Sequence, residues 1–291
     1  MPQDLFGFLN IYKPVGMTSH DVVAVLRRIT KIKQIGHTGT LDPFAQGVLP
    51  VCIGKATRLI EYLPDDKEYI ATVQFGSATT TYDVEGEVTF TSDKKISATE
   101  IDLKPFEGEI EQFPPIYSAI KVNGKKLYEY AREGKEVEIK PRNVTIEKIE
   151  LKNFNEQTQQ AEILIKCSKG TYIRSIAHDL GQNLGVGAHL IKLVRTQAGK
   201  FRVENSVQLD GINVKENLIN PLRMFDLPIL GVNDEELERI RHGVSIETPQ
   251  NSTVLTSNDR FVVLEYNDYV VAIGMINGKT IKAKKVFLWK R

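Results

Sequence analysis

The chain has 291 residues, of which 41% are hydrophobic and 26% are charged, a balance typical of a globular protein with one large domain or two. The formal net charge of +1 excludes a protein that is cationic throughout. No apolar run approaches the roughly 20 residues that a membrane-spanning helix needs. The first six residues lack the basic and apolar regions of a signal peptide, so we expect a cytoplasmic protein with no membrane partner.

The charges are distributed unevenly along the chain. Residues 1–60 carry seven Lys or Arg and three Asp or Glu, whereas residues 61–116 carry four Lys and thirteen Asp or Glu. Residues 279–291 carry six bases and no acid. Because the local field decides nucleic-acid binding, a basic face for RNA is compatible with the neutral total.

The two cysteines and the remaining metal-binding residue types predict no metal site. Cys52 and Cys167 lie in apolar surroundings far apart in the sequence, which favours two buried, reduced thiols. No pair of cysteines or histidines has the spacing of a metal motif. We therefore expect neither a metal nor another cofactor.

The first predicted elements are a strand and a helix. Residues 6–14 read as a strand that ends at a proline. Thr18 is suited to cap a helix whose apolar residues recur at helical spacing up to about residue 33.

A loop rich in glycine and proline follows, with the sequence GHTGTLDPFAQGVLP at residues 36–50. It leads into an apolar run, residues 48–54, that reads as a buried strand. Its one carboxylate, Asp42, is either a turn residue that bonds its own backbone or a catalytic acid, and the two interpretations are equally supported by these residues alone.

The next elements alternate between strands and helices. We expect a short helix over residues 55–63, a strand over 67–76, a helix over 97–107 and a strand hairpin made by 143–151 and 160–167. An apolar helical stripe begins at Ile173. Arg174 lies in the first turn of that helix, where a cation opposes the helix dipole, which indicates an anionic partner nearby.

The loop at 36–50, followed by GKATR at residues 54–58, resembles the catalytic signature of the bacterial tRNA pseudouridine-55 synthases, the TruB family. The match is long and free of gaps. Residues 10–19 (NIYKPVGMTS), 167–181 (CSKGTYIRSIAHDLG) and 189–201 (HLIKLVRTQAGKF) resemble further motifs of the same family.

The resemblance implies roles for three residues. Asp42 is the nucleophile in uridine isomerisation, and Arg174 is its ion-pair partner. Tyr69 lies against the target base, although a tyrosine in a strand is by itself more often a packing residue. Since Arg174 would favour the ionised carboxyl, it should lower the pKa of Asp42 relative to an unpaired buried acid.

The resemblance also supplies candidate substrate-binding residues. His37 is a candidate to fill the space that the flipped base leaves, with a purely structural role as the alternative. Leu193 matches the leucine that lines the uracil pocket, where core packing would equally explain it. Lys13 and Tyr172 belong to the family motifs. Lys121 and Arg132 lie in a basic region that resembles an RNA-gripping insertion; a solvated charged face is the alternative.

The fold implied by the resemblance is an α+β pseudouridine-synthase fold, with a mixed, mainly antiparallel central sheet flanked by helices. We expect a catalytic domain at residues 1–231, with its insertion at about 117–143. Residues 232–291 resemble a PUA domain, a small β-barrel-like RNA-binding module, or form a generic small β domain. Strands are expected near 253–255, 260–266, 269–276 and 286–289.

The function implied by the resemblance is isomerisation of uridine 55 in the T arm of tRNA, by a monomer. One alternative is a non-catalytic RNA-binding or tRNA-folding protein on the same scaffold. Another is a phosphate-handling enzyme that uses the glycine-rich loop, but the loop lacks a GK[ST] ending. The sequence leaves open whether Asp42 attacks the uracil ring or the reaction begins by deprotonation of the ribose.

Overall fold

The computed structural model describes residues 5–249, 255–256 and 259–287. Its helices are α1 (Ser19–Thr30), α2 (Leu127–Arg132), α3 (Ile173–Leu184) and α4 (Asp234–Arg241). Short 3₁₀ helices occupy Gly54–Tyr62, Ala98–Glu100, Lys104–Phe106, Val203–Asn205 and Pro221–Met224. None of the described helices is long and apolar enough to cross a bilayer.

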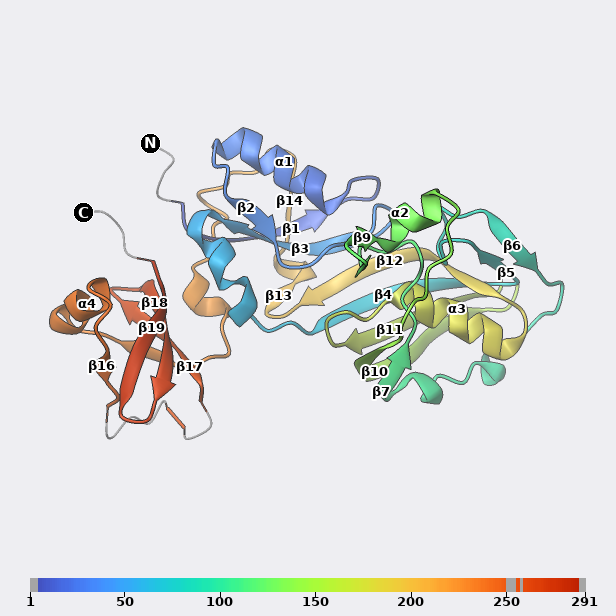
Figure 1. The fold of residues 1–291 in the computed structure, drawn as a ribbon. Coiled ribbons are helices and arrows are strands. Elements are labelled where there is room, and N and C mark those ends of the chain that lie inside the picture. The colour runs from blue at the N-terminus through green and yellow to red at the C-terminus, as the bar shows by residue number, and fades with distance from the viewer. Residues whose placement is uncertain (1–4, 250–254, 257–258, 288–291) are drawn as a thin grey trace.

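A ten-stranded sheet forms the larger part of the molecule (Figure 1). Its strands are β1 (Gly7–Lys13), β2 (Ile35–His37), β3 (Gln46–Ile53), β4 (Lys67–Phe75), β7 (Gly108–Gln112), β10 (Arg142–Asn155), β11 (Gln160–Cys167), β12 (Ala188–Ala198), β13 (Phe201–Arg202) and β14 (Val207–Gln208). The main path runs β14-β1-β3-β12-β4-β11-β10-β7, with β2 on β3 and β13 on β12. Only the β1–β14 and β3–β12 pairs are parallel, which confirms the mixed, mainly antiparallel sheet.

Two hairpins stand beside this sheet. The first pairs β5 (Ser77–Thr79) with β6 (Val88–Thr91), and the second pairs β8 (Lys121–Val122) with β9 (Lys125–Lys126). The second hairpin leads directly into α2, so the predicted insertion at 117–143 contains one small hairpin and one short helix.

Two helices bury their apolar faces in the same core as the sheet. At the start of α1, the side chain of Thr18 accepts a hydrogen bond from the Asp21 amide, and the Asp21 carboxylate accepts one from the Thr18 amide. The buried residues of α1 and α3 join one cluster with those of β1, β3, β4, β11 and β12. Burial of these apolar faces, more than intrinsic propensity, stabilises both helices.

The helix predicted over residues 97–107 is wrong. The chain forms only two 3₁₀ turns there, Ala98–Glu100 and Lys104–Phe106. Pro105 lacks an amide hydrogen, which an α-helix would use. Ile96, Ile101 and Phe106 are all buried in the main core, and a spacing of five residues does not return to one face of a helix.

A second, five-stranded sheet closes the chain. Its strands are β15 (Ile229–Gly231), β16 (Ile246–Glu247), β17 (Phe261–Tyr266), β18 (Tyr269–Asn277) and β19 (Thr280–Val286), in the order β15-β17-β18-β19-β16. The sheet thus begins at Ile229, slightly before the predicted boundary. The strand residues predicted at 253–254 and 288–289 lie outside the described residues.

The second sheet packs against the first part of the chain through a shared apolar cluster. Phe6 and Phe287 lie with ring centroids 5.6 Å apart, and Tyr62 contacts Phe261 edge to face at 5.4 Å. Arg58 donates a 3.0 Å hydrogen bond to the Val286 carbonyl. The cluster therefore joins the two sheets into one packed body.

Candidate active site

Asp42 lies on the loop between β2 and β3, and backbone contacts hold this loop. The Gly16 amide donates to the Pro43 carbonyl at 2.9 Å. Ser19, at the start of α1, donates to the Leu41 carbonyl and accepts from the Leu41 amide. Leu41 is itself buried, so the residue that precedes the carboxylate is anchored in the core.

Lys13 is fully buried beneath this loop. Its ammonium donates to the carbonyls of Pro14 and Met17 at 2.8 and 2.6 Å, and to that of Pro43 at 3.3 Å. Burial lowers the pKa of Lys13 to about 8, and the Asp42 carboxylate opposes that shift. The prediction of direct substrate contact does not fit this burial. Lys13 instead holds the loop from below.

Arg195, which the sequence analysis missed, is a second buried cation under the loop. Its guanidinium donates to the carbonyls of Val48, Thr40 and Gly39 at 2.7, 3.2 and 3.0 Å. The alternation of side chains along a strand could have identified Arg195, because Leu193 and Arg195 are two residues apart and share one face of β12.

Gly47 permits the close approach of β3 to β12. Its φ is 106°, and an added Cβ would lie only 2.3 Å from the Arg195 carbonyl oxygen. Any larger residue would push apart the two strands that carry the loop and Arg195.

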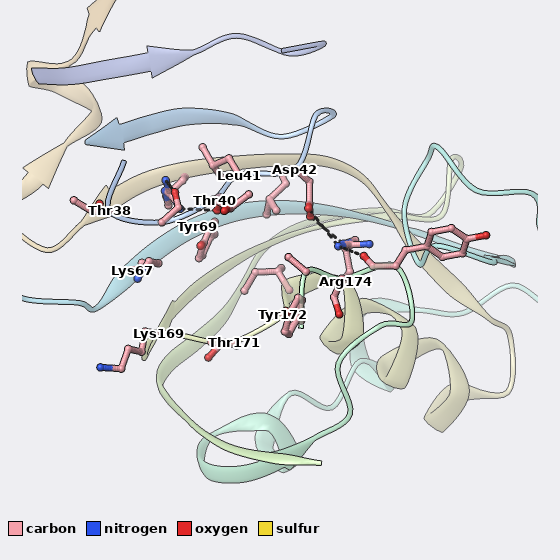
Figure 2. A pocket seen from close by; sticks show the side chains of 18 of the residues that line it. Thr38, Thr40, Leu41, Asp42, Lys67, Tyr69, Lys169, Thr171, Tyr172 and Arg174 are labelled. Carbon is pink, nitrogen blue, oxygen red and sulfur yellow. Dashed lines mark hydrogen bonds and ion pairs between the residues drawn. The ribbon is translucent and has the colours of Figure 1, made fainter. Parts of the chain in front are cut away.

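The Asp42 carboxylate forms an ion pair with Arg174, the second residue of α3 (Figure 2). The Nε atom of Arg174 lies 2.9 Å from Asp42 Oδ2, and its Nη2 donates to Oδ1 at 3.3 Å. Asp42 is thus the anionic partner that a cation in the first turn of the helix indicates, and it is the residue that the family resemblance implied.

Arg174 serves a second buried acid that the sequence analysis also missed. Its Nη1 lies 3.3 Å from Asp83 Oδ2 and donates to the Thr81 carbonyl at 3.0 Å, while Nη2 donates to the Tyr117 carbonyl. The side chains of Arg174 and Asp83 are 6% and 4% exposed, so two carboxylates share one buried guanidinium.

The charge state of Asp42 reflects this arrangement. Its side chain is 34% exposed, so one part of the carboxylate meets the cavity. Burial raises the pKa of Asp42, Arg174 opposes the rise, and the nearby Asp83 adds to it. Arg174 therefore lowers the pKa of Asp42 as expected, but burial has the larger effect and the net shift is upward.

A cavity of about 450 Å³ opens over the carboxylate, a size that suits a small ligand or a single nucleotide. Tyr69, Leu193, Tyr172 and Arg174 line it together with Asp42. Figure 2 shows Asp42, Tyr69, Tyr172 and Arg174 around the cavity. The insertion adds Tyr117, Ser118, Ala119 and Tyr128 to the lining. Burial raises the pKa of Tyr69, which keeps its hydroxyl protonated at neutral pH.

Besides Lys13, three further predicted substrate-binding residues lie outside the cavity lining. His37 ends β2 next to Thr38, which does line the cavity, and its ring meets His20 edge to face at 5.7 Å. Burial lowers the pKa of His37 to about 4, so the ring is neutral. Lys121 is exposed on β8, and Arg132 ends α2 with its guanidinium 5.3 Å from the Tyr128 ring centroid.

The arrangement supplies a carboxylate in an aromatic cavity, next to a fixed guanidinium. Such a carboxylate can act as a nucleophile or stabilise a developing cation, and the aromatic rings can stack on a planar base. Among the described residues, no three His, Cys, Asp or Glu side chains are grouped so that they could hold a metal ion. Cys52 and Cys167 are buried free thiols, as predicted.

Comparison with known proteins gives matches along most of the chain. Residues 27–173 match the model of the TruB family pseudouridylate synthase N-terminal domain, and residues 174–220 match that of the tRNA pseudouridylate synthase B C-terminal domain. The tRNA pseudouridine synthase B of Clostridium novyi (strain NT) is 42% identical over 97% of this chain and 99% of its own length. That of Bacillus subtilis (strain 168) is 41% identical over 92% of each chain.

Solved structures extend the similarity to the fold. A chain in the crystal structure of a Cbf5-Nop10-Gar1 complex superposes with a TM-score of 0.75 at 28% identity, covering 98% of this chain and 86% of that one. A chain in the structure of an H/ACA RNP bound to a substrate RNA containing 2'-deoxyuridine gives a TM-score of 0.69 at 26% identity, with the same coverage.

Proposed function

Because the chain belongs to the TruB family of pseudouridylate synthases, we propose that it converts uridine 55 in the T loop of tRNA to pseudouridine, with Asp42 as the catalytic carboxylate. The observation that carries the assignment is the ion pair of Asp42 with Arg174 at the floor of an aromatic cavity. Relatives named tRNA pseudouridine synthase B that match 97% of the chain support the substrate class.

The target base must leave its stack before it can reach Asp42. Extraction of a base costs a few kcal/mol, which contacts in the pocket offset. Tyr69, Tyr172 and Leu193 supply aromatic and apolar surfaces for the flipped uracil. The neutral ring of His37, beside the cavity, occupies the space that the base leaves in the RNA.

The chemistry breaks the bond between N1 and the ribose C1' and forms a bond from C5 to C1'. Asp42 either attacks the uracil ring or takes part in a route that begins by deprotonation of the ribose. Both routes need its ionised form. The C5 proton is then lost and N1 is protonated, so no atom is gained or lost in the isomerisation. Tyr69 is positioned to stack on the base and to relay the C5 proton.

We assign the domains by the same reasoning. Residues 1–231 form the catalytic domain, and the insertion at about 117–143 grips the RNA loop. Residues 232–291 form a PUA-like module that contacts a more distant part of the tRNA. We further assign the protein as a monomer, and the two free thiols suit the cytoplasm, where its tRNA is found.

Release of tritium from tRNA labelled at uridine C5, without added metal or cofactor, tests the proposal. We expect release from wild-type protein and none from the Asp42→Asn variant. Tight binding of tRNA without release would favour the alternative, a non-catalytic RNA-binding or tRNA-folding protein.

A further inference from the structure

The face of Arg174 turned away from Asp42 is held by the loop between β5 and β6. That loop presents the Thr81 carbonyl and the Asp83 carboxylate to Nη1 of Arg174, at 3.0 and 3.3 Å. The Asp83 carboxylate is fixed in turn, because its Oδ1 accepts from the Thr81 hydroxyl at 2.5 Å and from the Glu85 amide at 3.0 Å. The orientation of the Arg174 fork therefore depends on the conformation of this loop.

Tyr82, between these two contact residues, has an unusual backbone conformation. Its φ is 63°, in the left-handed region that glycine, asparagine and aspartate adopt more readily than tyrosine. Such a conformation persists only where the surroundings hold it. A tyrosine at this position therefore needs a compensating contact.

The compensating contact is a stack with His178. The two rings lie with centroids 3.8 Å apart and planes inclined by 12°. His178 is four residues after Arg174 in α3, so both side chains lie on one face of that helix. The Tyr82 carbonyl also accepts from the Leu190 amide at 3.0 Å, which ties the loop to β12.

We propose that the Tyr82–His178 stack is a positioning device for the reaction: it locks the β5–β6 loop so that Thr81 and Asp83 aim the Arg174 fork at Asp42. The expected change in isomerisation rate rests on the proposed function. The expected displacement of the Arg174 fork does not depend on activity. The alternative is that the stack contributes only to folding stability.

Substitutions at Tyr82 separate the ring from the backbone. Tyr82→Phe keeps the stacking surface, and we expect a single-turnover rate within about twofold of wild type at saturating tRNA. Tyr82→Gly removes the ring but accepts the left-handed backbone without strain. We expect its rate to fall about 10- to 100-fold, the cost of slight misplacement of a catalytic group, while tRNA affinity changes less than about threefold. Asn267→Gly, at a distant left-handed position with φ of 50°, should leave the single-turnover rate at saturating tRNA unchanged.

Substitutions at His178 repeat the test from α3. His178→Phe should preserve the rate, and His178→Ala should lower it as Tyr82→Gly does. The acid limb of kcat/KM should also move to higher pH in both ring-deleted variants, because a displaced Arg174 no longer opposes the rise in the pKa of Asp42. A role in stability alone would lower the melting temperature without moving this limb.

A crystal structure of the Tyr82→Gly or His178→Ala variant tests the proposal without an activity measurement. We expect the Arg174 fork to be displaced from Asp42. An unchanged Arg174–Asp42 geometry, or wild-type rates in the folded ring-deleted variants, would overturn the inference. Equal losses of the single-turnover rate in Tyr82→Phe and Tyr82→Gly would also overturn it. Absence of pseudouridine with wild-type protein would instead refute the proposed function.

Discussion

The Asp42 carboxylate is partly exposed, and buried residues hold it and its loop in place. The carboxylate meets the cavity on one side, and Arg174, Lys13 and the anchored Leu41 hold it or its loop on the others. Preorganised groups of this kind need little rearrangement during the reaction. The site therefore depends on several buried contacts that hold the carboxylate and its loop.

Replacement of Asp42 by asparagine tests the role of its charge. We expect Asp42→Asn to abolish isomerisation and to leave tRNA affinity within about tenfold, or ~1.4 kcal/mol, because shape and size are kept. Arg174 retains Asp83 and the carbonyls of Thr81 and Tyr117, so the variant should fold. Measurable turnover by a homogeneous Asn variant would show that the carboxylate is not essential.

The same substitution has a predicted effect on stability. The pKa of Asp42 is raised in the folded protein, so its contribution to stability is fully present below the unfolded pKa and is lost as pH rises through the folded pKa. Above the folded pKa the ionised carboxylate is thus a cost, and Asp42→Asn should there melt at or above the wild-type temperature. Calorimetry over a pH series measures this, and a clear decrease at the pH values where the wild-type protein is active would contradict it.

The pH dependence of activity follows from the same shift. Because the reaction needs ionised Asp42, kcat/KM should fall as pH drops through a pKa above the usual value of about 3.9. Arg174→Lys keeps a charge but loses the two-point contact, so it should lower turnover and move this acid limb to still higher pH. If the acid limb of kcat/KM in Arg174→Lys stays at its wild-type pH, the guanidinium does not affect the pKa of Asp42.

At the scale of elements, local patterns predicted most of the strands and helices near the site. Alternation and capping residues located β1, β4, β11 and α1, and the glycine-proline loop located Asp42. Asp83 and Arg195 escaped because their roles arise from long-range pairing, such as the isolated bridge between Asp83 and Leu190 and the register of β12 on β3. Lys13 was a substrate-binding candidate because it belongs to a family motif, and three carbonyls satisfy its ammonium inside the core.

The insertion that carries β8, β9 and α2 contains both a cavity-lining residue and exposed basic residues. Tyr128 reaches the cavity lining, while Lys121 and Arg132 are exposed. Leu127 is fully buried and anchors the segment, so deletion of the whole insertion would disturb more than RNA contacts. Point substitutions are therefore the sharper test of its function.

We expect the double variant Lys121→Gln, Arg132→Gln to bind tRNA more weakly with nearly unchanged single-turnover chemistry at saturation. If each residue contacts one phosphate, the slope of log K against log salt should fall by roughly 0.9 for each residue lost, or about 1.8 in all. Lys152→Gln, at an exposed site on β10, serves as the control. An unchanged slope in the double variant would assign these bases to a solvated face.

At the scale of the whole molecule, the shared core limits how the C-terminal sheet can be studied. Phe6 and Tyr62 pack on Phe287 and Phe261, and Asn220 donates to the Asp268 carbonyl. Removal of residues 232–291 would expose these apolar contacts and leave β15 without its partner strand. Loss of activity in such a truncation would therefore report destabilisation as well as lost RNA contacts.

Surface substitutions on β19 test the C-terminal sheet without opening the core. Lys282 and Lys284 are both exposed on β19. If their side chains contact a distant tRNA segment, Lys282→Gln with Lys284→Gln should weaken binding and lower the salt slope by up to about 1.8, with single-turnover isomerisation at saturating tRNA unchanged. Lys95→Gln, in the acidic region of the chain, should alter neither quantity. A slower saturated rate in the folded double variant would mean that this sheet also helps to position the uridine, because binding alone is overcome by saturation.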